Sequence, residues 1–371
     1  MKIGTLTFHR ACNYGGALQC YALVKALNQM GYDAEVIDYR SPAIEKSYEL
    51  ISFDSLKALI FSILLFHRNY KRKKSFRNFS KKFVPTSNKA YFNADEISNQ
   101  YDLCFIGSDQ VWSKRINHGF DSVFWGQFKG RKASYAASMG TDHNYTNEEY
   151  LSIRSYLSSF DNISTREDSL RQELQPYTNI IIETVIDPTL LISQKDYQGI
   201  AVMPKEKDYV LYYQMEYNPD SKKFVSAIAE QLGCMVVTIM GPNEDYGNLV
   251  HIHKQVFQVN VQEFVGYILN AKCVIASSFH GTALPIAMRK DFYFLANYES
   301  DRSENLLRHI GALDRMKKSN ESVKFTPVNY SEIEPKLEAF VKKSEEYVSS
   351  CILSLEKLKT VKKPLHSTRL S

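Results

Sequence analysis

The sequence predicts an α/β protein with two doubly wound domains, each a parallel sheet covered by helices on both faces. Apolar runs typical of buried strands alternate with segments of helical spacing, an order that favours βαβ units. The alternation restarts near residue 209, after a stretch without clear periodicity at 191–207. A length of 371 residues also suits two domains. We expect the two domains to face each other across a central cleft between strand ends, where ligands bind in such folds.

In the first half, strands are expected at short apolar runs that end in turn residues, and helices where apolar residues recur every three or four positions. Gly31 supplies a stop for the first helix, and Pro188 breaks the pattern of the run at 184–188, which closes this half. The expected strands are 2–8, 34–39, 103–106, 132–138 and 162–165, and the expected helices are 17–30, segments up to about 83, and 150–160.

In the second half, Gly233 and Gly311 follow the last apolar positions of two helical segments and are expected to end them. The expected strands are 209–214, 235–239, 273–275 and 292–295, and the expected helices are 222–232, 262–270, one starting near 284, 303–310 and 333–359. The last of these helices is long enough to pack back across both halves. We therefore divide the chain into domains at 1–195 and 196–330, followed by a C-terminal helix and basic tail at 331–371.

The composition excludes several classes of protein. Hydrophobic residues make up 44% and charged residues 23%, as in ordinary globular proteins. The six cysteines are far apart and form no CxxC pair, which argues against a disulfide framework or a zinc site. The net charge of +5 is mild, and no nucleic-acid motif accompanies it. Because residues 1–8 resemble a first strand rather than a secretory leader, we expect a cytoplasmic protein, with the inner face of the membrane as a second location.

One basic stretch leaves two interpretations open. Residues 66–74 are rich in Lys and Arg and follow the largely apolar run 56–66, which is too short to span a bilayer. The stretch can contact anionic lipid headgroups or a phosphorylated lipid substrate, as a peripheral membrane contact. It can equally be the solvated end of a surface helix, which is the interpretation favoured by charge pattern alone.

A candidate site follows the strand predicted at 273–275. The residues Ser278, His280 and Gly281 stand between that strand and the next helix. The start of a helix offers free backbone N–H groups and a partial positive charge, which favour an anion. A histidine there can hold a phosphate and move a proton near neutral pH. The alternative is a helix cap with a packed histidine.

Seven short motifs occur along the chain in a fixed order. They are Asn13-Tyr14-Gly15-Gly16-Ala17-Leu18-Gln19, Gly107-Ser108-Asp109-Gln110-Val111-Trp112, Ser134-Tyr135-Ala136-Ala137-Ser138, Ile163-Ser164-Thr165-Arg166-Glu167, Val185-Ile186-Asp187-Pro188-Thr189-Leu190-Leu191, Ser278-Phe279-His280-Gly281, and Arg302 ahead of Leu306-Leu307 and Gly311. Together they resemble the polysaccharide pyruvyl transferase family over residues 1 to 315.

This resemblance implies a fold of two Rossmann-like domains similar to GT-B glycosyltransferases. It also implies an activity, the transfer of the pyruvyl group of phosphoenolpyruvate to two hydroxyls of a sugar. The product is a cyclic pyruvate ketal and phosphate leaves. Members of the family modify capsule and exopolysaccharide sugars, in some cases on a polyprenyl-diphosphate carrier. Phosphoenolpyruvate is then the donor substrate, and no further cofactor is expected.

Four side chains are candidates for this chemistry, two of them because they match the motifs of the family. Arg166 and Arg302 match arginine positions of the motifs and are expected to hold the phosphate and carboxylate of the donor, because a guanidinium pairs with either oxyanion through two N–H groups. His280 is the candidate acid or phosphate ligand. Asp109 is the candidate base for the acceptor, or a helix cap. The alternative for each arginine is an ion pair with a neighbouring carboxylate in the sequence.

The remaining candidates are expected to bind substrate. Asn13, Tyr14 and Gln19 carry groups that hydrogen-bond sugars, and Gly15 permits a tight turn before the first helix. Ser278 and Gly281 would let the backbone approach a phosphate. The glycines do not form a G-x-G-x-x-G fingerprint, so we expect no nicotinamide cofactor.

No catalytic metal is expected either, because His9, His251 and His253 lack partners at metal-ligand spacing. Asp187, ahead of Pro188, is expected to end a strand rather than to react.

Two other functions compete with pyruvyl transfer. A nucleotide-sugar glycosyltransferase would share the implied fold, but the second half offers no clear acidic contact for a ribose. A non-catalytic glycan-binding protein would have no need of Arg166, His280 and Arg302 together.

Overall fold

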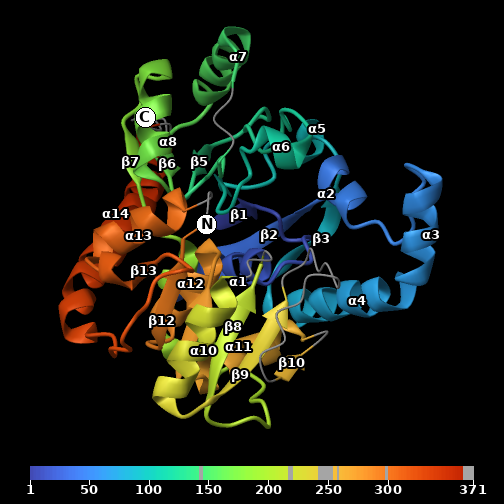
Figure 1. Ribbon diagram of the computed structural model, residues 1–371. Helices are drawn as coiled ribbons and strands as arrows, with labels where there is room; N and C mark the ends of the chain where they lie inside the picture. The colour runs from blue at the N-terminus through green and yellow to red at the C-terminus, as the bar shows by residue number, and fades with distance from the viewer. Residues whose placement is uncertain (142–144, 216–219, 241–253, 257–258, 297–299, 362–371) are drawn as a thin grey trace, which may run out of the picture.

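The computed structural model describes residues 1–141, 145–215, 220–240, 254–256, 259–296 and 300–361. Two parallel sheets, each flanked by helices, lie at the centre of the two halves (Figure 1). The first sheet has the strand order β3-β2-β1-β4-β5. Its strands are β1 (Lys2–Leu6), β2 (Asp33–Tyr39), β3 (Thr86–Tyr91), β4 (Leu103–Ile106) and β5 (Lys132–Ser134). A pair of short parallel strands, β6 (Ile163–Thr165) and β7 (Ile182–Thr184), continues from β5 through single bridges.

The second sheet has the order β10-β9-β8-β11-β12-β13, and all its pairs are parallel. Its strands are β8 (Tyr209–Gln214), β9 (Met235–Met240), β10 (Lys254–Val256), β11 (Cys273–Ala276), β12 (Asp291–Leu295) and β13 (Met316–Lys317). In each sheet the chain first adds strands on one side of its first strand and then returns to add strands on the other side. Dinucleotide-binding domains have the same strand order. This order confirms the predicted fold of two Rossmann-like α/β domains.

Helices cover the sheets and connect the strands. In the first half they are α1 (Tyr14–Gln29), α2 (Pro42–Ser47), α3 (Leu56–Leu64), α4 (Phe66–Phe83), α5 (Ala94–Ile97), α6 (Lys114–Asn117), α7 (Asn147–Leu157) and α8 (Asp168–Leu174). The later helices are α9 (Gln194–Gln198), α10 (Ser221–Leu232), α11 (Val261–Asn270), α12 (Phe279–Ala287), α13 (Asp301–Ile310) and α14 (Tyr330–Val361). Among the described residues, none of these helices is both long and apolar enough to cross a bilayer.

Several predicted boundaries were wrong. Strand β5 stops at Ser134 rather than at residue 138, because Ala136 takes a left-handed conformation with φ of 46° that a strand does not continue through. Helix α12 begins at Phe279, so His280 lies inside its first turn rather than before it. The short edge strands β3, β10 and β13 were not predicted, since their sequences are polar or only two or three residues long.

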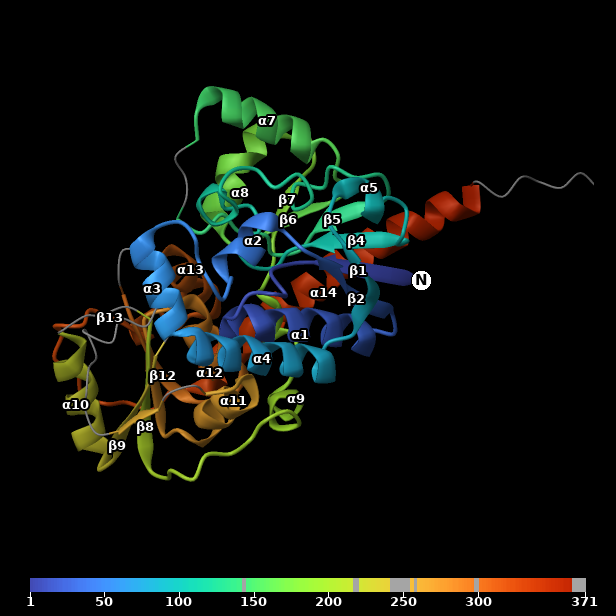
Figure 2. The ribbon, with the colours of Figure 1, turned by 90° about the vertical axis from the view of Figure 1, so that its right-hand side faces the viewer.

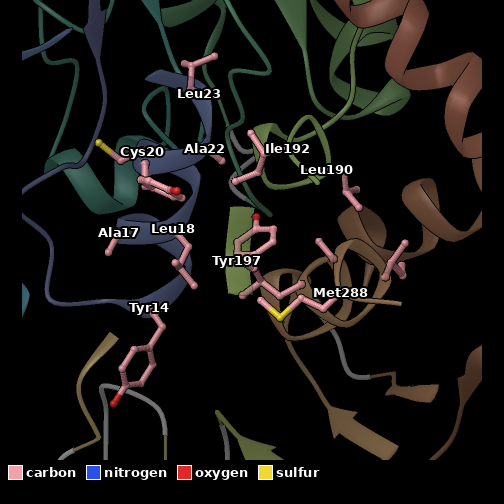
Figure 3. Close-up of a cluster of buried hydrophobic side chains, with 14 of the residues drawn as sticks. Tyr14, Ala17, Leu18, Cys20, Ala22, Leu23, Leu190, Ile192, Tyr197 and Met288 are labelled. Atoms are coloured by element: carbon pink, nitrogen blue, oxygen red, sulfur yellow. The ribbon is translucent and has the colours of Figure 1, made fainter. Parts of the chain in front are cut away.

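Apolar side chains fill the space between the two halves along α1. Tyr14 and Leu18 of α1 belong to the same buried cluster as Tyr197 of α9 and Met288 of the second half (Figure 3). The ring of Tyr14 stacks on Phe264 of α11, with centroids 4.2 Å apart. The two halves thus share one continuous core, which fixes their relative position near the candidate site.

The long helix α14 passes behind α1 and reaches the first half (Figure 2). The Ser344 hydroxyl accepts a hydrogen bond from the backbone N–H of Ile186 at 2.9 Å. Farther along α14, the Tyr347 hydroxyl donates to the carbonyl of Ser134 at 2.8 Å. The helix therefore supports the strand ends that carry the predicted site.

Candidate active site

The predicted site residues lie at the carboxyl ends of strands in both sheets. Asp109 follows β4, and His280 follows β11. These strands border the positions where each sheet reverses its order, between β1 and β4 and between β8 and β11. Open α/β sheets bind ligands at such positions, because the loops on either side diverge and leave a crevice. Arg166 follows β6, so three strand ends converge on one region.

Asp187 is the centre of this region. Its Oδ2 lies 2.9 Å from Nη2 of Arg166 and accepts a hydrogen bond from the Ser108 hydroxyl at 3.3 Å. Its Oδ1 accepts two more bonds from Thr189, from the backbone N–H at 2.9 Å and from the hydroxyl at 2.6 Å. The carboxylate side chain is completely buried. The prediction that Asp187 ends a strand rather than reacts did not include its contacts with Arg166 and Ser108, because these two partners are distant in sequence.

The carboxyl of Asp187 is held in its ionised form. Burial alone would raise its pKa, but the positive charge of Arg166 and the neighbouring His280 hold the pKa of Asp187 well below its usual range. A permanently negative group therefore stands between the arginine of the first half and the histidine of the second.

Arg166 is 3% exposed, which is unusual for an arginine. Besides Asp187, its Nη2 also bonds the Ser108 hydroxyl, and the guanidinium lies over the Phe279 ring, 4.7 Å from the centroid. Its Nε and Nη1 are buried and have no hydrogen-bond partner among the described residues. Buried guanidinium groups normally use their donors, so these two N–H positions are available to a ligand. The expected alternative, a surface ion pair with an adjacent carboxylate, is not the arrangement found.

His280 occupies the first turn of α12, where the Ser278 side chain caps the helix. Its Nε2 lies 3.6 Å from Oδ2 of Asp187, longer than a hydrogen bond but close enough for an ion pair when the imidazole is protonated. The ring rests against the backbone of Gly15 in α1. A Cβ at Gly15 would stand 2.2 Å from Nδ1 of His280, closer than any real contact. The glycine thus leaves room for a histidine from the other half.

Arg302 lies in the first turn of α13, and its charge acts on Glu167. Glu167 is fully buried, and its Oε1 accepts a hydrogen bond from the Ser138 hydroxyl at 2.9 Å. Burial raises the pKa of Glu167 to about 7, although Arg166 and Arg302 both act to lower it. A carboxyl that titrates near neutrality beside two arginines was not predicted. Its only signal in the sequence is its place directly after Arg166.

Helix α13 holds the two halves together next to these groups. The Asn305 side chain accepts from the backbone N–H of Asp168 at 3.3 Å and donates to the carbonyl of Arg166 at 3.2 Å. His309 contacts Asp168 at 2.8 Å, and the Ser169 hydroxyl donates to Asp301 at 2.6 Å. Through these bonds the backbone of Arg166 is fixed by an element of the second half.

Asp109 lies on the turn after β4 and is partly exposed. Its φ of 77° is left-handed, a conformation that aspartate tolerates better than most residues. One carboxylate oxygen accepts from the backbone N–H of Gln110 at 2.9 Å. The other faces Gly16, where an added Cβ would sit 3.5 Å away. Asp109 therefore borders the start of α1, on the side of the first half.

The residues predicted to bind sugar have structural contacts. The Asn13 side chain caps α1 by accepting from the backbone N–H groups of Gly15 and Gly16. The Tyr14 hydroxyl donates to the carbonyl of Val259 at 2.6 Å, across the two halves. Gln19 is fully buried and donates to the Thr7 hydroxyl at 2.8 Å.

Ser278 and Gly281 also serve the local fold. The Ser278 hydroxyl accepts from the backbone N–H of Gly281 at 3.1 Å, which is an ordinary helix cap. A Cβ at Gly281 would stand 2.5 Å from that of Ala276. The glycine lets α12 start close to the end of β11.

Within the described ranges, no group of three or more His, Cys, Asp and Glu side chains is arranged to hold a metal. His9 instead contacts Asp38 through Nε2 at 3.1 Å. His251 and His253 lie outside the described residues.

The sequence profile of polysaccharide pyruvyl transferases matches residues 13–299. The chain belongs to the polysaccharide pyruvyl transferase family. The matched region includes Arg166, Asp187 and His280 and ends just before Arg302. The family name describes a transferase that acts on polysaccharide. Among curated proteins, none matches the sequence.

Solved structures of low sequence identity resemble the chain over nearly its whole length. The UDP-N-acetylglucosamine 2-epimerase of Neisseria meningitidis bound to UDP-GlcNAc gives a TM-score of 0.46 at 10% identity, covering 95% of this chain and 94% of its own. That of Methanocaldococcus jannaschii gives 0.45 at 11%, covering 92% and 93%. The glycosyltransferase SnogD of Streptomyces nogalater gives 0.42 at 11%, covering 97% and 99%.

Proposed function

We propose that this family member transfers the pyruvyl group of phosphoenolpyruvate to two hydroxyls of a sugar, forming a cyclic ketal and releasing phosphate. The observation that carries the proposal is the buried cluster in which Arg166 of the first half meets His280 of the second half around Asp187. Arg302 adds a second arginine, whose charge acts on Glu167.

The charge of this cluster suits a small anion with several charges. Two arginines, and His280 when protonated, stand against the carboxylate of Asp187 and against Glu167, which is only partly ionised near neutral pH because its pKa is about 7. The net charge is positive, and the groups are largely withdrawn from water, where each interaction with an anion is stronger. The two unpaired N–H positions of Arg166 fit one oxyanion of the donor, and Arg302 serves the other.

The reaction needs a proton at the methylene carbon of the donor. Protonation there gives an oxocarbenium-like carbon, which one sugar hydroxyl attacks. Phosphate then leaves as the C–O bond to it breaks, and the second hydroxyl closes the ring. Of the two hydroxyl protons, one replaces the proton given to the methyl group and the other leaves with phosphate. The positively charged groups stabilise the departing phosphate.

His280 and Asp109 have separate tasks in this scheme. His280 lies 3.6 Å from the carboxylate of Asp187, and in this scheme it either gives the proton or binds the phosphate. Asp109 lies next to the start of α1 and is the candidate base for the acceptor hydroxyl. The acceptor is a sugar of a cell-surface polysaccharide, free or carried on a polyprenyl diphosphate.

Calorimetry with phosphoenolpyruvate tests the donor assignment, with a panel of nucleotide-sugars measured beside it. We expect saturable binding of phosphoenolpyruvate that Arg166→Ala and Arg302→Ala each weaken by more than about 100-fold, since each removes a charge-assisted contact. Lys222→Ala, on the exposed face of α10, is the control and keeps full affinity. Binding of a nucleotide-sugar in place of phosphoenolpyruvate would instead identify a glycosyltransferase.

The His280→Ala variant separates the two roles of the histidine. If His280 gives the proton, phosphoenolpyruvate binds normally and phosphate release slows by about 100-fold or more. If it binds the phosphate, affinity falls together with turnover. Normal affinity with normal phosphate release would remove His280 from the mechanism.

A further inference from the structure

Helix α3 exposes an apolar face to solvent. Leu56, Ile60, Ile63 and Leu64 recur at helical spacing and share one side of the helix. Leu56 is 74% exposed and Leu64 is 72% exposed, and α3 has no buried residue. The apolar face of a surface helix normally packs against the core, whereas this apolar face of α3 is turned toward solvent. Exposed apolar patches of this kind mark surfaces that bind a membrane or another molecule.

The same surface is strongly basic. The sequence from residue 56 to residue 83 contains nine Lys and Arg residues and no Asp or Glu. Helix α4 follows α3 directly, and its Lys71 and Lys74 are exposed. Arg68 and Lys82, at opposite ends of α4, line a cavity of about 460 Å³ between α4 and α11, together with Lys71 and Lys74. An apolar helix followed by one that is rich in Lys and Arg and has no acidic residue is the pattern of segments that lie in the interface of an anionic bilayer.

The position of α4 places this surface beside the candidate active site. Phe76 and Phe79 of α4 are buried against α1, so α4 is anchored while α3 extends to the periphery in both views (Figures 1 and 2). In the second turn of α4, Arg72 donates to the carbonyl of Cys12 at 2.9 Å, next to the turn that precedes α1. That turn leads to Gly15, which contacts His280.

We propose that α3 and the exposed lysines of α4 dock the protein on a membrane of anionic phospholipids. The docking surface consists of Leu56, Ile60, Ile63 and Leu64 of α3 with Lys71 and Lys74 of α4. The apolar side chains enter the boundary between headgroups and acyl chains, and the lysines pair with lipid phosphates. A helix of nine residues is about 13 Å long, enough to lie in the plane of the interface but not to cross it.

Charge argues against a second copy of the chain as the occupant. A two-fold dimer through this surface would bring the basic segments of both copies together, because an isologous contact pairs each patch with itself. The segment carries no acidic side chain that would offset this repulsion. Anionic lipid supplies the opposite charge and an apolar layer at once.

Co-sedimentation of the full chain with vesicles tests the proposal. We expect binding to vesicles of phosphatidylcholine with 30% phosphatidylglycerol, and much weaker binding to phosphatidylcholine alone. The Ile60→Gln/Leu64→Gln variant should weaken binding to anionic vesicles by about tenfold or more, since it removes apolar area without adding charge. Lys71→Gln/Lys74→Gln should weaken it similarly and reduce its sensitivity to salt.

Matched controls use equally exposed residues elsewhere. Leu151 and Ile181 are exposed apolar residues of the first half outside this surface, and Leu151→Gln/Ile181→Gln should bind like the unchanged protein. Lys222→Gln/Lys223→Gln on α10 removes the same charge at a distant site. Circular dichroism confirms that each variant is folded.

Four outcomes would overturn the proposal. The unchanged protein could fail to bind anionic vesicles. It could bind them equally well after the α3 and α4 changes, or lose binding equally in the controls. Finally, light scattering could reveal a dimer in solution that Ile60→Gln/Leu64→Gln dissociates, which would assign the surface to a second copy.

Discussion

The backbone of Gly15 supports the imidazole of His280, although the two residues belong to different halves of the chain. The glycine is needed for this contact rather than for its backbone conformation, since it lies in the first turn of α1 with no left-handed φ. The adjacent Gly16 has ordinary space around it, with Asp109 3.5 Å from the position of a Cβ. Two neighbouring glycines therefore differ sharply in what an added methyl group would do.

Gly15→Ala should displace His280 and reduce turnover by about 100-fold or more, because a Cβ there overlaps the ring. Gly16→Ala should retain most of the activity and equal or slightly higher stability, as alanine favours a helix over glycine. Phosphate release and chemical denaturation measure both effects. Equal losses of activity in the two variants would mean that the turn, and not the contact with His280, requires glycine.

The raised pKa of Glu167 makes the free energy of unfolding fall as pH rises. Its pKa is raised in the folded protein to about 7 from an ordinary value of 4.5, so the folded state holds this proton more tightly. The stabilisation from the protonated carboxyl is complete below about pH 4.5 and is lost as pH rises through 7. We expect the unfolding free energy of the Glu167→Gln variant to fall less between pH 5 and pH 8 than that of the unchanged protein. Urea titrations at four pH values measure this difference, and parallel curves would contradict the assignment.

Helix α14 supports the segment that ends in Asp187. The Ser344 hydroxyl is the partner of the Ile186 N–H, one residue before the carboxylate. Ser344 is completely buried, whereas Ser350 on the same helix is exposed and bonds only its own helix backbone among the contacts described. The C-terminal helix thus contributes to the site without touching the reacting groups.

Ser344→Ala should lower the free energy of unfolding by roughly 1–3 kcal/mol, because it leaves a buried backbone N–H without a partner. It should also raise the dissociation constant of phosphoenolpyruvate as Asp187 and Arg166 lose their fixed position. Ser350→Ala is the control and should change neither quantity. A fall in stability with unchanged donor affinity would limit α14 to a purely structural role.

The elements that the sequence predicts well are those with strong periodicity. Strands β4 and β11 are apolar throughout, and α10 and α13 end at Gly233 and Gly311 in left-handed caps, so their patterns were clear. The edge strand β3 reads Thr-Ser-Asn-Lys-Ala-Tyr and is half exposed, so it lacks an apolar signal. It forms because β2 offers an open edge, which is a tertiary cause that local sequence does not contain.

At the scale of the whole molecule, one buried apolar cluster extends through both halves, beside a further cluster within each half. The buried cluster around α1 includes Tyr14 and Leu18 from the first half, Met288 from the second, and Tyr347 from α14. Interfaces between independent domains are usually smaller and more polar. Unfolding one half would expose the apolar face of the other.

We therefore expect the protein to unfold in one cooperative transition. Differential scanning calorimetry should give a single peak whose calorimetric and van't Hoff enthalpies agree. Tyr14→Phe, which removes the hydrogen bond to Val259 across the halves, should shift this peak to lower temperature without splitting it. Two resolved peaks in the unchanged protein would mean that the halves fold independently.

The family resemblance predicts that Arg166, His280 and Arg302 face one cleft, but the partners of Arg166 and His280 came from the three-dimensional arrangement. Asp187 is 21 residues from Arg166 and 93 from His280, so no local pattern joins them. Gln19 has a side chain suited to sugar, yet its position on α1 turns it into the interior. The sequence shows which side chains could bind a sugar, but where each side chain points depends on the packing of the folded chain.

The space above Gly15 also constrains how such chains can be recombined. A chimera can join the first half of one relative to the second half of another. The residue at position 15 then comes from one protein and the histidine at position 280 from the other. If position 15 carries any side chain, the imidazole has no room, however well the two cores match. The glycine and the histidine therefore form a pair that has to be inherited together, even though 265 positions separate them in the chain.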